Sequence, residues 1–318
     1  MTNSLAIETL ERHLFVPASQ EHKVERIEDV DKLLAGSGYV GDQEIATAIF
    51  LAIRLRRPLL IEGHAGVGKT EIAKALTAAL STTMYRLQCY EGLDVSSALY
   101  EWNYAKQILR IRMEEQSGRT VAEKEAAIFS EPYLMARPLL QALRHHDKSP
   151  VLLIDEIDRA DEEFEAFLLE VLSEYQVTIP ELGPIGAEHP PYVVLTSNRV
   201  RELGDALKRR CLYLWIDYPS LKKELQIVRI KIPGIAETLA RQVCRFVQEL
   251  RAIDLDKRPG VAETLDWGMA LCELSGDHLS LDVARATLGC LVKSKHDVER
   301  VQSSLSELIE KSAEGQLS

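Results

Sequence analysis

Five short apolar runs are spaced along the first two thirds of the chain, and stretches of helical periodicity separate them. Short runs rich in apolar residues predict strands that are buried in a sheet. Alternating strands and helices predict an α/β fold, with a mostly parallel sheet and helices on both faces. The predicted strands are RPLLIEG (57–63), MYRLQCY (84–90), VLLIDEID (151–158), YVVLTSN (192–198) and CLYLWIDY (211–218).

Helical periodicity governs much of the rest of the chain. Ile45, Ile49 and Ile53 recur at four-residue spacing and predict an amphipathic helix that leads into the first strand. Beyond the fifth strand the strand signals stop, and further helices are predicted at 262–274, 281–291 and 298–311. One more helical face is formed by Leu239, Val243, Phe246, Val247 and Leu250.

These patterns divide the chain into parts. We expect a polar extension in residues 1–27, a nucleotide-binding core in 28–218 and an all-helical domain in 219–318. Tyr218-Pro219 is the natural hinge between core and helical domain, because proline restricts the backbone on both of its sides. Two connections in the core, residues 94–135 and 177–191, are longer than plain connections need to be, and such excursions are usually functional.

Composition and charge narrow the function classes. The 318-residue chain is 46% hydrophobic and carries a formal net charge of −11. Such a chain lacks the basic surface that a nucleic-acid duplex requires, so we expect no nucleic-acid partner. No apolar run approaches the length of a membrane span, and the N-terminal segment has no signal-peptide pattern. Because the five cysteines form no C-x-x-C pair, we expect a reducing, cytoplasmic location.

The stretch GHAGVGKT, Gly63 to Thr70, fits the phosphate-loop pattern G-x-x-x-x-G-K-[ST] between a predicted strand and a predicted helix. Its glycines let backbone amides turn toward a polyphosphate, Lys69 would reach the β- and γ-phosphates, and Thr70 would bind Mg²⁺. The alternative is a glycine-rich turn that only happens to precede a helix. The motif therefore predicts that the chain binds ATP and Mg²⁺. The expected nucleotide-binding residues here are Gly63, His64, Ala65, Gly66, Val67, Gly68, Lys69, Thr70 and Glu71.

Two carboxylates follow the third predicted strand. Asp155 would hold Mg²⁺, and Glu156 would polarise the water that attacks the γ-phosphate. Alternatively, both acids cap the next helix, since acids are common in first turns. A phosphate loop upstream favours the catalytic interpretation.

Two further features follow the acid pair. Asn198 ends the fourth strand, where its amide would contact the γ-phosphate or the attacking water; an asparagine that only ends a strand in a turn is the alternative. Arg209 and Arg210 precede the fifth strand and would stabilise charge on the transferring phosphoryl group of a neighbouring subunit. Arg210 is favoured because it lies closer to the strand, and a solvated basic turn is the alternative.

The order of these motifs, followed by an all-helical domain, resembles an AAA+ P-loop ATPase, and within that class the MoxR family. The segments YEGLDVSSALYEWNYAKQILRIR (90–112) and PGVAETLDW (259–267) resemble the accessory ATPases of molybdenum carbon monoxide dehydrogenases. The resemblance implies a strand order of 5-1-4-3-2, a C-terminal helical lid, a hexameric ring and nucleotide sites between subunits. It also implies an adenine pocket at Tyr39, Val40 and Gly41, which could equally be an ordinary turn.

The sequence departs from the family pattern in the helical domain. Relatives usually carry a sensor arginine near the start of the third lid helix, whereas this chain has Glu263 and Thr264 there. Arg258 in the preceding loop is a possible substitute. Asp158 stands where many relatives have asparagine, and we expect little effect on catalysis.

The two long connections are the expected partner contacts. Residues 94–135 correspond to the helix-2 insertion of the MoxR group, which faces the ring pore, and 177–191 resembles an inserted hairpin. We expect Tyr100, Trp102 and Tyr104 to contact a client protein. The alternative is an aromatic cluster that packs the insertion onto its own domain.

The leading hypothesis is an ATPase that remodels a partner protein. The resemblance implies a client that is an immature molybdenum hydroxylase such as carbon monoxide dehydrogenase, and a von Willebrand A-domain protein as adaptor. One alternative is a nucleic-acid-associated motor on the same core. Another is a nucleotide-gated binding module that hydrolyses little.

Overall fold

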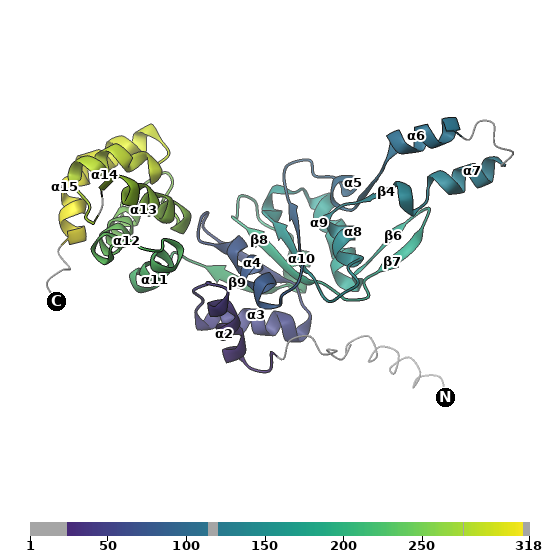
Figure 1. Ribbon diagram of the computed structural model, residues 1–318, viewed down its shortest axis with the longest axis horizontal. Coiled ribbons are helices and arrows are strands. Elements are labelled where there is room, and N and C mark those ends of the chain that lie inside the picture. Colours follow the sequence, from purple (N-terminus) through teal and green to yellow (C-terminus); the bar gives the residue numbers. More distant parts are fainter. Residues whose placement is uncertain (1–23, 114–119, 276, 314–318) are drawn as a thin grey trace.

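The computed structural model describes residues 24–113, 120–275 and 277–313. The molecule is elongated: a helical C-terminal region lies at one end, a sheet with flanking helices in the middle, and a helical arm at the other end (Figure 1). The predicted extension, residues 1–27, lies largely outside the described residues. None of the helices in the described ranges combines the length and apolar character needed to cross a bilayer.

The central sheet contains five parallel strands in the order β2-β5-β8-β1-β9. Counted along the core strands this is 2-3-4-1-5, so the predicted order 5-1-4-3-2 is confirmed. Each strand falls inside a predicted apolar run. Their bounds are β1 Leu59–Gly63, β2 Met84–Gln88, β5 Val151–Asp155, β8 Tyr192–Ser197 and β9 Leu212–Ile216.

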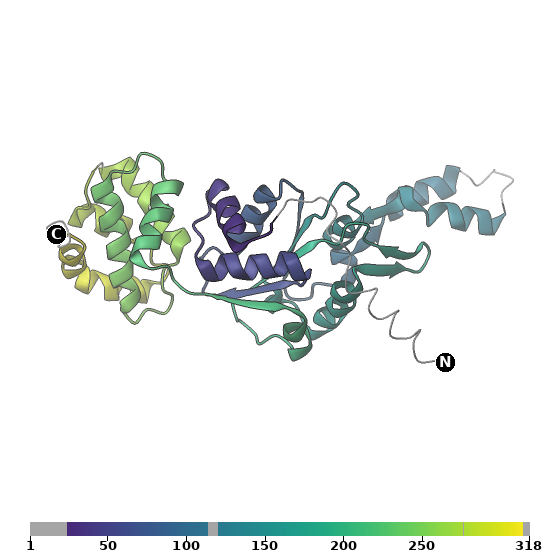
Figure 2. The ribbon, with the colours of Figure 1, turned by 90° about the horizontal axis from the view of Figure 1, so that it is seen from below.

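Helices cover both faces of the sheet, because alternate strand residues point to opposite faces (Figure 2). Leu59 and Ile61 pack with α2 (Ile27–Gly36), α3 (Gln43–Leu55) and α4 (Lys69–Ala79). Leu60 packs into the other core. That core also includes side chains of α8 (Pro138–Leu143), α9 (Glu162–Glu174) and α10 (Asp205–Arg210).

The C-terminal helical region has a core of its own. All five residues predicted to share a face of α12 (Glu237–Ala252) are fully buried in it. The last predicted helices are also present, although α14 stops at Thr287 and continues as a 3₁₀ turn, Leu288–Cys290. The other helices are α11 Leu221–Lys231, α13 Val261–Ser275, α14 Leu281–Thr287 and α15 Lys295–Ala313. We call this region the lid.

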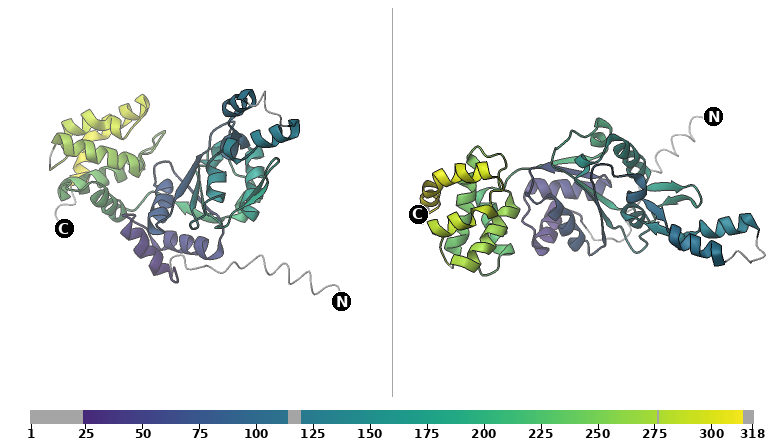
Figure 3. Two further views of the ribbon diagram at one scale, coloured as in Figure 1. Left: turned by 45° about the vertical axis from the view of Figure 1, so that its right-hand side comes forward. Right: turned by 90° about the horizontal axis from the view of Figure 1, so that it is seen from above.

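Residues 94–113 and 120–136 form the arm, which projects away from the lid (Figure 3). The pair β3–β4 forms its base, and α6 carries exposed apolar side chains, among them Ile108 and Leu109. The expectation that Trp102 contacts a client is wrong. Trp102 is buried and packs edge-on against Phe129, because the strand pair turns it into the core. The elements are α5 Val95–Ala98, β3 Tyr100–Trp102, α6 Tyr104–Met113, α7 Val121–Ile128, η1 Glu131–Tyr133 and β4 Leu134–Ala136.

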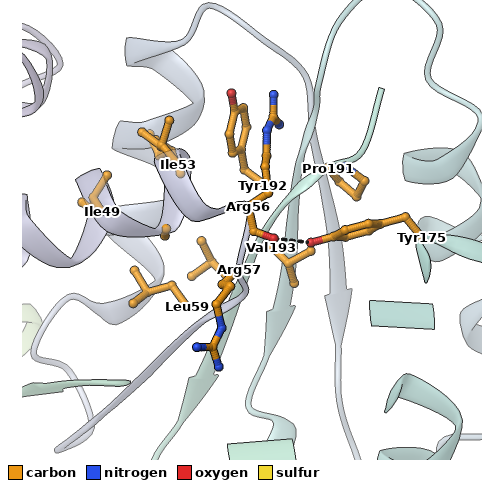
Figure 4. Close-up of a pocket in the computed structure, with 12 residues that line it drawn as sticks. Ile49, Ile53, Arg56, Arg57, Leu59, Tyr175, Pro191, Tyr192 and Val193 are labelled. Carbon is orange, nitrogen blue, oxygen red and sulfur yellow. Dashed lines mark hydrogen bonds between the residues drawn. The ribbon is translucent and has the colours of Figure 1, made fainter. Parts of the chain in front are cut away.

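The second long connection contains an antiparallel hairpin, β6 (Gln176–Ile179) with β7 (Gly183–Gly186), as predicted. Arg56 ties its base to the amino edge of the sheet. The guanidinium lies 4.4 Å from the Tyr192 ring centroid, and the Tyr175 hydroxyl donates to the Arg56 carbonyl at 3.0 Å (Figure 4). The cavity there measures only about 10 Å³. It is no larger than about one water needs, so we assign it a packing role.

Candidate functional site

The phosphate loop joins β1 to α4 at the carboxyl edge of the sheet, where active groups of parallel sheets gather. Gly66 and Gly68 have φ of 75° and 93°, a left-handed backbone that glycine adopts without strain. A Cβ on Gly63 would lie 2.1 Å from the Ile216 carbonyl oxygen, so only glycine fits beside β9. The loop is thus shaped by the residues that carried the motif.

Lys69 crosses the loop and links it to the neighbouring strand. Its Nζ donates to the carbonyl oxygens of Gly63 and His64 at 2.8 and 2.7 Å, and to Asn198 Oδ1 at 2.7 Å. Burial lowers the pKa of Lys69, while the nearby carboxylates of Asp158, Asp155 and Glu156 oppose the shift. An ammonium with few water contacts and only neutral hydrogen-bond acceptors is suited to receive phosphate oxygens.

Asp155 is the buried carboxylate of the site. Its Oδ1 accepts from the hydroxyls of Thr70 at 3.1 Å and Thr196 at 2.5 Å. Its Oδ2 accepts from Arg86 Nε at 3.0 Å and from an Arg86 terminal nitrogen at 2.5 Å. A hydroxyl beside a carboxylate is the kind of oxygen donor set that Mg²⁺ takes with water and phosphate. The pair Thr70 and Asp155 therefore fits the predicted metal role.

Glu156 lies beside this carboxylate on a strained backbone with φ of 55°. Its backbone N–H donates to the Thr196 hydroxyl at 2.9 Å, and its side chain pairs with Arg159 at 3.2 Å. The alternative in which the acid pair caps the next helix is wrong. Glu156 stands at the N-cap position of the 3₁₀ turn Ile157–Arg159, but its side chain makes no cap hydrogen bond there, and Asp161 caps α9. Strain of this kind commonly marks functional positions.

Asp158 fixes the loop that carries Asn198. It is buried, and its Oδ2 accepts from the backbone N–H groups of Asn198 at 3.1 Å and Val200 at 2.8 Å. This carboxylate therefore has a positioning role that the sequence did not suggest.

A pocket of about 490 Å³ opens beside the phosphate loop, within the size range of small-molecule sites. Tyr39 and Val40 line it, whereas Gly41 lines the adjoining hollow. The lid supplies the opposite wall, with apolar side chains and two lysines that sequence reasoning missed. These are Lys223, Ile227, Lys231, Val261, Ala262 and Leu265.

The lid also contacts the phosphate loop directly. The backbone N–H groups of Val261 and Ala262 donate to the Gly66 carbonyl oxygen at 2.8 and 3.2 Å. A Cβ on Gly260 would lie 2.7 Å from the Ala65 carbonyl oxygen, so the approach requires glycine. PGVAETLDW thus places the start of α13 on the loop.

No arginine from the described part of the lid lines the pocket. Thr264 is buried and donates to Glu224 Oε1 at 2.8 Å, and Glu263 accepts from the Gly260 N–H at 2.9 Å. Arg258 is exposed and is absent from the pocket walls. The suggested substitution of Arg258 for the sensor arginine stays a prediction, since Arg258 does not line this pocket.

Arg209 and Arg210 lie on α10, outside the pocket. The Arg210 guanidinium is bound to its own subunit, through Ser173 Oγ at 3.1 Å and the Ala206 carbonyl at 3.2 Å. The Arg209 guanidinium is exposed and has no hydrogen-bond or ion-pair partner within the described ranges. The structure thus brings residues 65–71 together with Asp155, Glu156 and Asn198 at one pocket. The predicted residues Gly63 and His64 do not line this pocket, although their carbonyl oxygens accept from Lys69 Nζ.

Comparison with known proteins finds an AAA domain in the core. Residues 58–211 match the family described as AAA domain (dynein-related subfamily). An uncharacterized protein of Staphylococcus haemolyticus is 25% identical over 271 residues, 83% of this chain and 93% of that protein. An uncharacterized protein of Staphylococcus saprophyticus is 22% identical over 284 residues, 87% of this chain and 99% of that protein.

Among solved structures, the Thermotoga maritima RuvB Holliday junction branch migration motor aligns with a TM-score of 0.45 and 17% identity. That alignment covers 92% of this chain and 80% of RuvB. The matched AAA domain spans the phosphate loop, Asp155, Asn198 and the arginine pair. Together with the strand order and the helical lid, it identifies the fold as that of AAA+ ATPases.

Proposed function

We propose that this chain is a MoxR-type AAA+ ATPase, which hydrolyses ATP in a cytoplasmic homo-oligomeric ring, a hexamer, to remodel a partner protein. The observation that carries the proposal is the hydrogen-bonded set of Lys69, Thr70, Asp155 and Asn198 in one pocket that the lid closes. Phosphate loop, metal carboxylate and sensor amide are the parts that phosphoryl transfer needs, because its catalysis is mostly positioning and charge neutralisation.

The residues divide the work. Lys69 and the loop amides hold the phosphates, and Tyr39 and Val40 with the lid wall enclose the base. Thr70 and Asp155 would hold Mg²⁺, which when bound neutralises phosphate charge. Glu156 accepts a proton from the attacking water, and Asn198 orients that water. Arg209 or Arg210 of the neighbouring subunit stabilises the transferring group, since neither reaches its own pocket.

We infer the client from the resemblance stated above: an immature molybdenum hydroxylase such as carbon monoxide dehydrogenase, undergoing metal-centre assembly with a von Willebrand A-domain adaptor. The exposed apolar side chains of α6, rather than Trp102, are the arm's contact with that client. The five cysteines are all unpaired, which fits the cytoplasm.

The test uses Glu156→Gln beside the wild type. We expect kcat for ATP hydrolysis to fall by about 10²–10⁴-fold while nucleotide affinity stays the same, because only the base is removed. An unchanged rate would contradict the assigned mechanism. The same variant, tagged, should retain engaged partners with ATP. Recovery of neither a molybdenum hydroxylase subunit nor an A-domain protein would contradict the client assignment alone.

The alternatives make different predictions. A nucleic-acid motor would show ATPase stimulated by DNA. A gated binding module would support its partner equally well as Glu156→Gln. The chain's acidic balance disfavours the first alternative, and the complete set of catalytic groups disfavours the second.

A further inference from the structure

Three aromatic side chains form a cluster behind the phosphate loop, at the carboxyl end of β9. The His64 ring stacks on the Tyr218 ring, with centroids 4.6 Å apart and an interplanar angle of 9°. The His64 ring also meets the Trp215 ring edge-on at 5.7 Å. His64 is the second residue of the phosphate loop and Tyr218 belongs to the predicted hinge, so the cluster joins loop and hinge.

An arginine guanidinium lies over each of the two outer rings of the cluster, Trp215 and Tyr218. The Arg199 guanidinium lies 5.7 Å from the Trp215 ring centroid, and Arg199 directly follows the predicted sensor, Asn198. The Arg251 guanidinium, from the lid, lies 4.8 Å from the Tyr218 ring centroid. Both distances are within the range of cation–π contacts. The five side chains therefore form a continuous stack from the sensor loop to the lid.

The two cations are held to different degrees, and the Arg199 side chain is the more exposed, at 61%. Arg199 has a left-handed backbone with φ of 59°, and its Nε lies 3.7 Å from Glu62 Oε2. Arg251 is buried and donates to the two Glu224 oxygens at 2.8 and 2.7 Å. Its Nε donates to the Pro259 carbonyl oxygen at 2.8 Å.

The hydrogen bond from Arg251 to the Pro259 carbonyl connects Arg251 to the lid segment that contacts the phosphate loop. Pro259 precedes Gly260, and the next two backbone N–H groups, of Val261 and Ala262, donate to the Gly66 carbonyl. A shift of Arg251 would move this segment. None of the five stacked side chains lines the nucleotide pocket, so each acts through another group.

We propose that Arg199, Trp215, His64, Tyr218 and Arg251 are positioning residues that couple the sensor loop to the lid. The stack does in this chain what a lid arginine in contact with the terminal phosphate would do. The inference rests on the proposed function only in taking Asn198 as the residue that contacts the γ-phosphate. Contact between side chains does not by itself show that the sensor loop and the lid are energetically coupled, so the experiment measures that coupling.

The readout is hydrogen exchange at the amides of Val261 and Ala262, which report whether the lid is docked on the loop. Exchange is compared in ADP and in the non-hydrolysable β,γ-imido analogue of ATP, on the full chain. We expect the two rates to differ by about fivefold or more in the wild type, the size of a modest allosteric coupling. In Tyr218→Ala the exchange rates in the two nucleotides should differ by less than about twofold, with both nucleotides still bound.

Two matched variants separate stacking from general perturbation. Tyr218→Phe keeps the ring and should keep the wild-type ratio. Tyr90→Ala removes an exposed tyrosine outside the stack and should leave the ratio unchanged. A wild-type ratio in Tyr218→Ala overturns the proposal. If Tyr218→Ala does not fold, Trp215→Ala replaces it, because that ring lies at the surface with a relative exposure of 36%.

A double-mutant cycle tests whether sensor and stack act in series. Asn198→Ala combined with Tyr218→Ala should lower the ratio no further than either change alone. Additive losses overturn the proposal. A wild type that hydrolyses ATP but shows no difference between the two nucleotides overturns it as well, and leaves the ATPase assignment standing.

Discussion

The core and the lid line the nucleotide pocket with different kinds of side chain. In the core wall Lys69 and Asp155 are each held by several hydrogen bonds: Lys69 Nζ has three acceptors, and the Asp155 carboxylate accepts from three side chains. In the lid wall the contacts are apolar, and the two lysines at the rim pair with exposed acids, Lys223 with Asp42 and Lys231 with Glu71. The core wall is therefore arranged for chemistry, and the lid wall for enclosing and releasing the nucleotide.

Among the described residues, no arginine lines the core wall to assist Lys69 at the transferring group, and the largest prediction concerns an arginine from the next subunit. Replacing both Arg209 and Arg210 by alanine should lower kcat by about 10³–10⁵-fold, the contribution of an arginine supplied in trans. Of the single changes, Arg209→Ala should lower kcat more, because the Arg209 guanidinium has no bound partner among the described residues, whereas Arg210 is bound to Ser173. Steady-state ATPase of the three variants checks this.

Mixing provides the control. Glu156→Gln and the arginine double variant should each be nearly inactive on their own. In rings that contain both variants, activity should return at those subunit interfaces where the arginine double variant supplies the intact pocket and the Glu156→Gln subunit supplies the intact arginines. If mixing restores nothing although mixed rings form, the arginines do not act across a subunit boundary.

The next largest effect tests the core wall itself. Lys69→Met should lower kcat/KM for ATP by about 10²–10³-fold, as for loss of one charge-stabilising group in a closed site. Fluorescence titration with labelled nucleotide should show weaker binding as well, since Lys69 reaches the phosphates in the ground state. Normal binding with a lost kcat would instead assign Lys69 to the transition state alone.

The same residue predicts a pH dependence. Burial lowers the pKa of Lys69 below its ordinary value of 10.5, so the ammonium loses its proton at a lower pH than an exposed lysine would. As pH rises through that lowered pKa, kcat/KM should fall, approaching about tenfold per pH unit. Lys69→Arg, which stays charged, should lose this alkaline limb even if its overall rate is low. An unchanged limb would assign the titration to another group.

How much of this the sequence could predict depends on whether the signal was local. The phosphate loop and the positions of the five strands were predictable because glycines and apolar runs are local signals. The strand order was implied only by the family resemblance, because it depends on which strands pair. Arg86 was not, because its role depends on register: β2 pairs with β5 so that Arg86 lies opposite Leu153, two residues from Asp155 on the same face. Trp102 was misassigned for a similar reason, since only strand pairing turns it inward.

The residues of the lid wall were even harder to predict from the sequence, because their roles depend on contacts with distant parts of the chain. Gly260 had no sequence signal of its own. Its need for glycine comes from the Ala65 carbonyl in a distant part of the chain. Likewise, Lys223 and Lys231 match no motif in the sequence, and only the position of α11 beside the pocket makes them lining residues.

The smallest effect tests the lid wall. Lys231 Nζ lies 3.5 Å from Glu71 Oε2, and both side chains are about 40% exposed, so the pair is screened by solvent. Lys231→Ala should raise KM for ATP by no more than about fivefold with kcat unchanged, and 0.5 M salt should reduce the difference further, as expected for roughly 0.2–1 kcal/mol. Lys74→Ala is the matched control, because Lys74 pairs with the same Glu71 from within α4 and leaves the lid untouched. If Lys231→Ala lowered kcat by a hundredfold while Lys74→Ala did not, the lid would contribute to the chemistry, and the division between the two walls would be wrong.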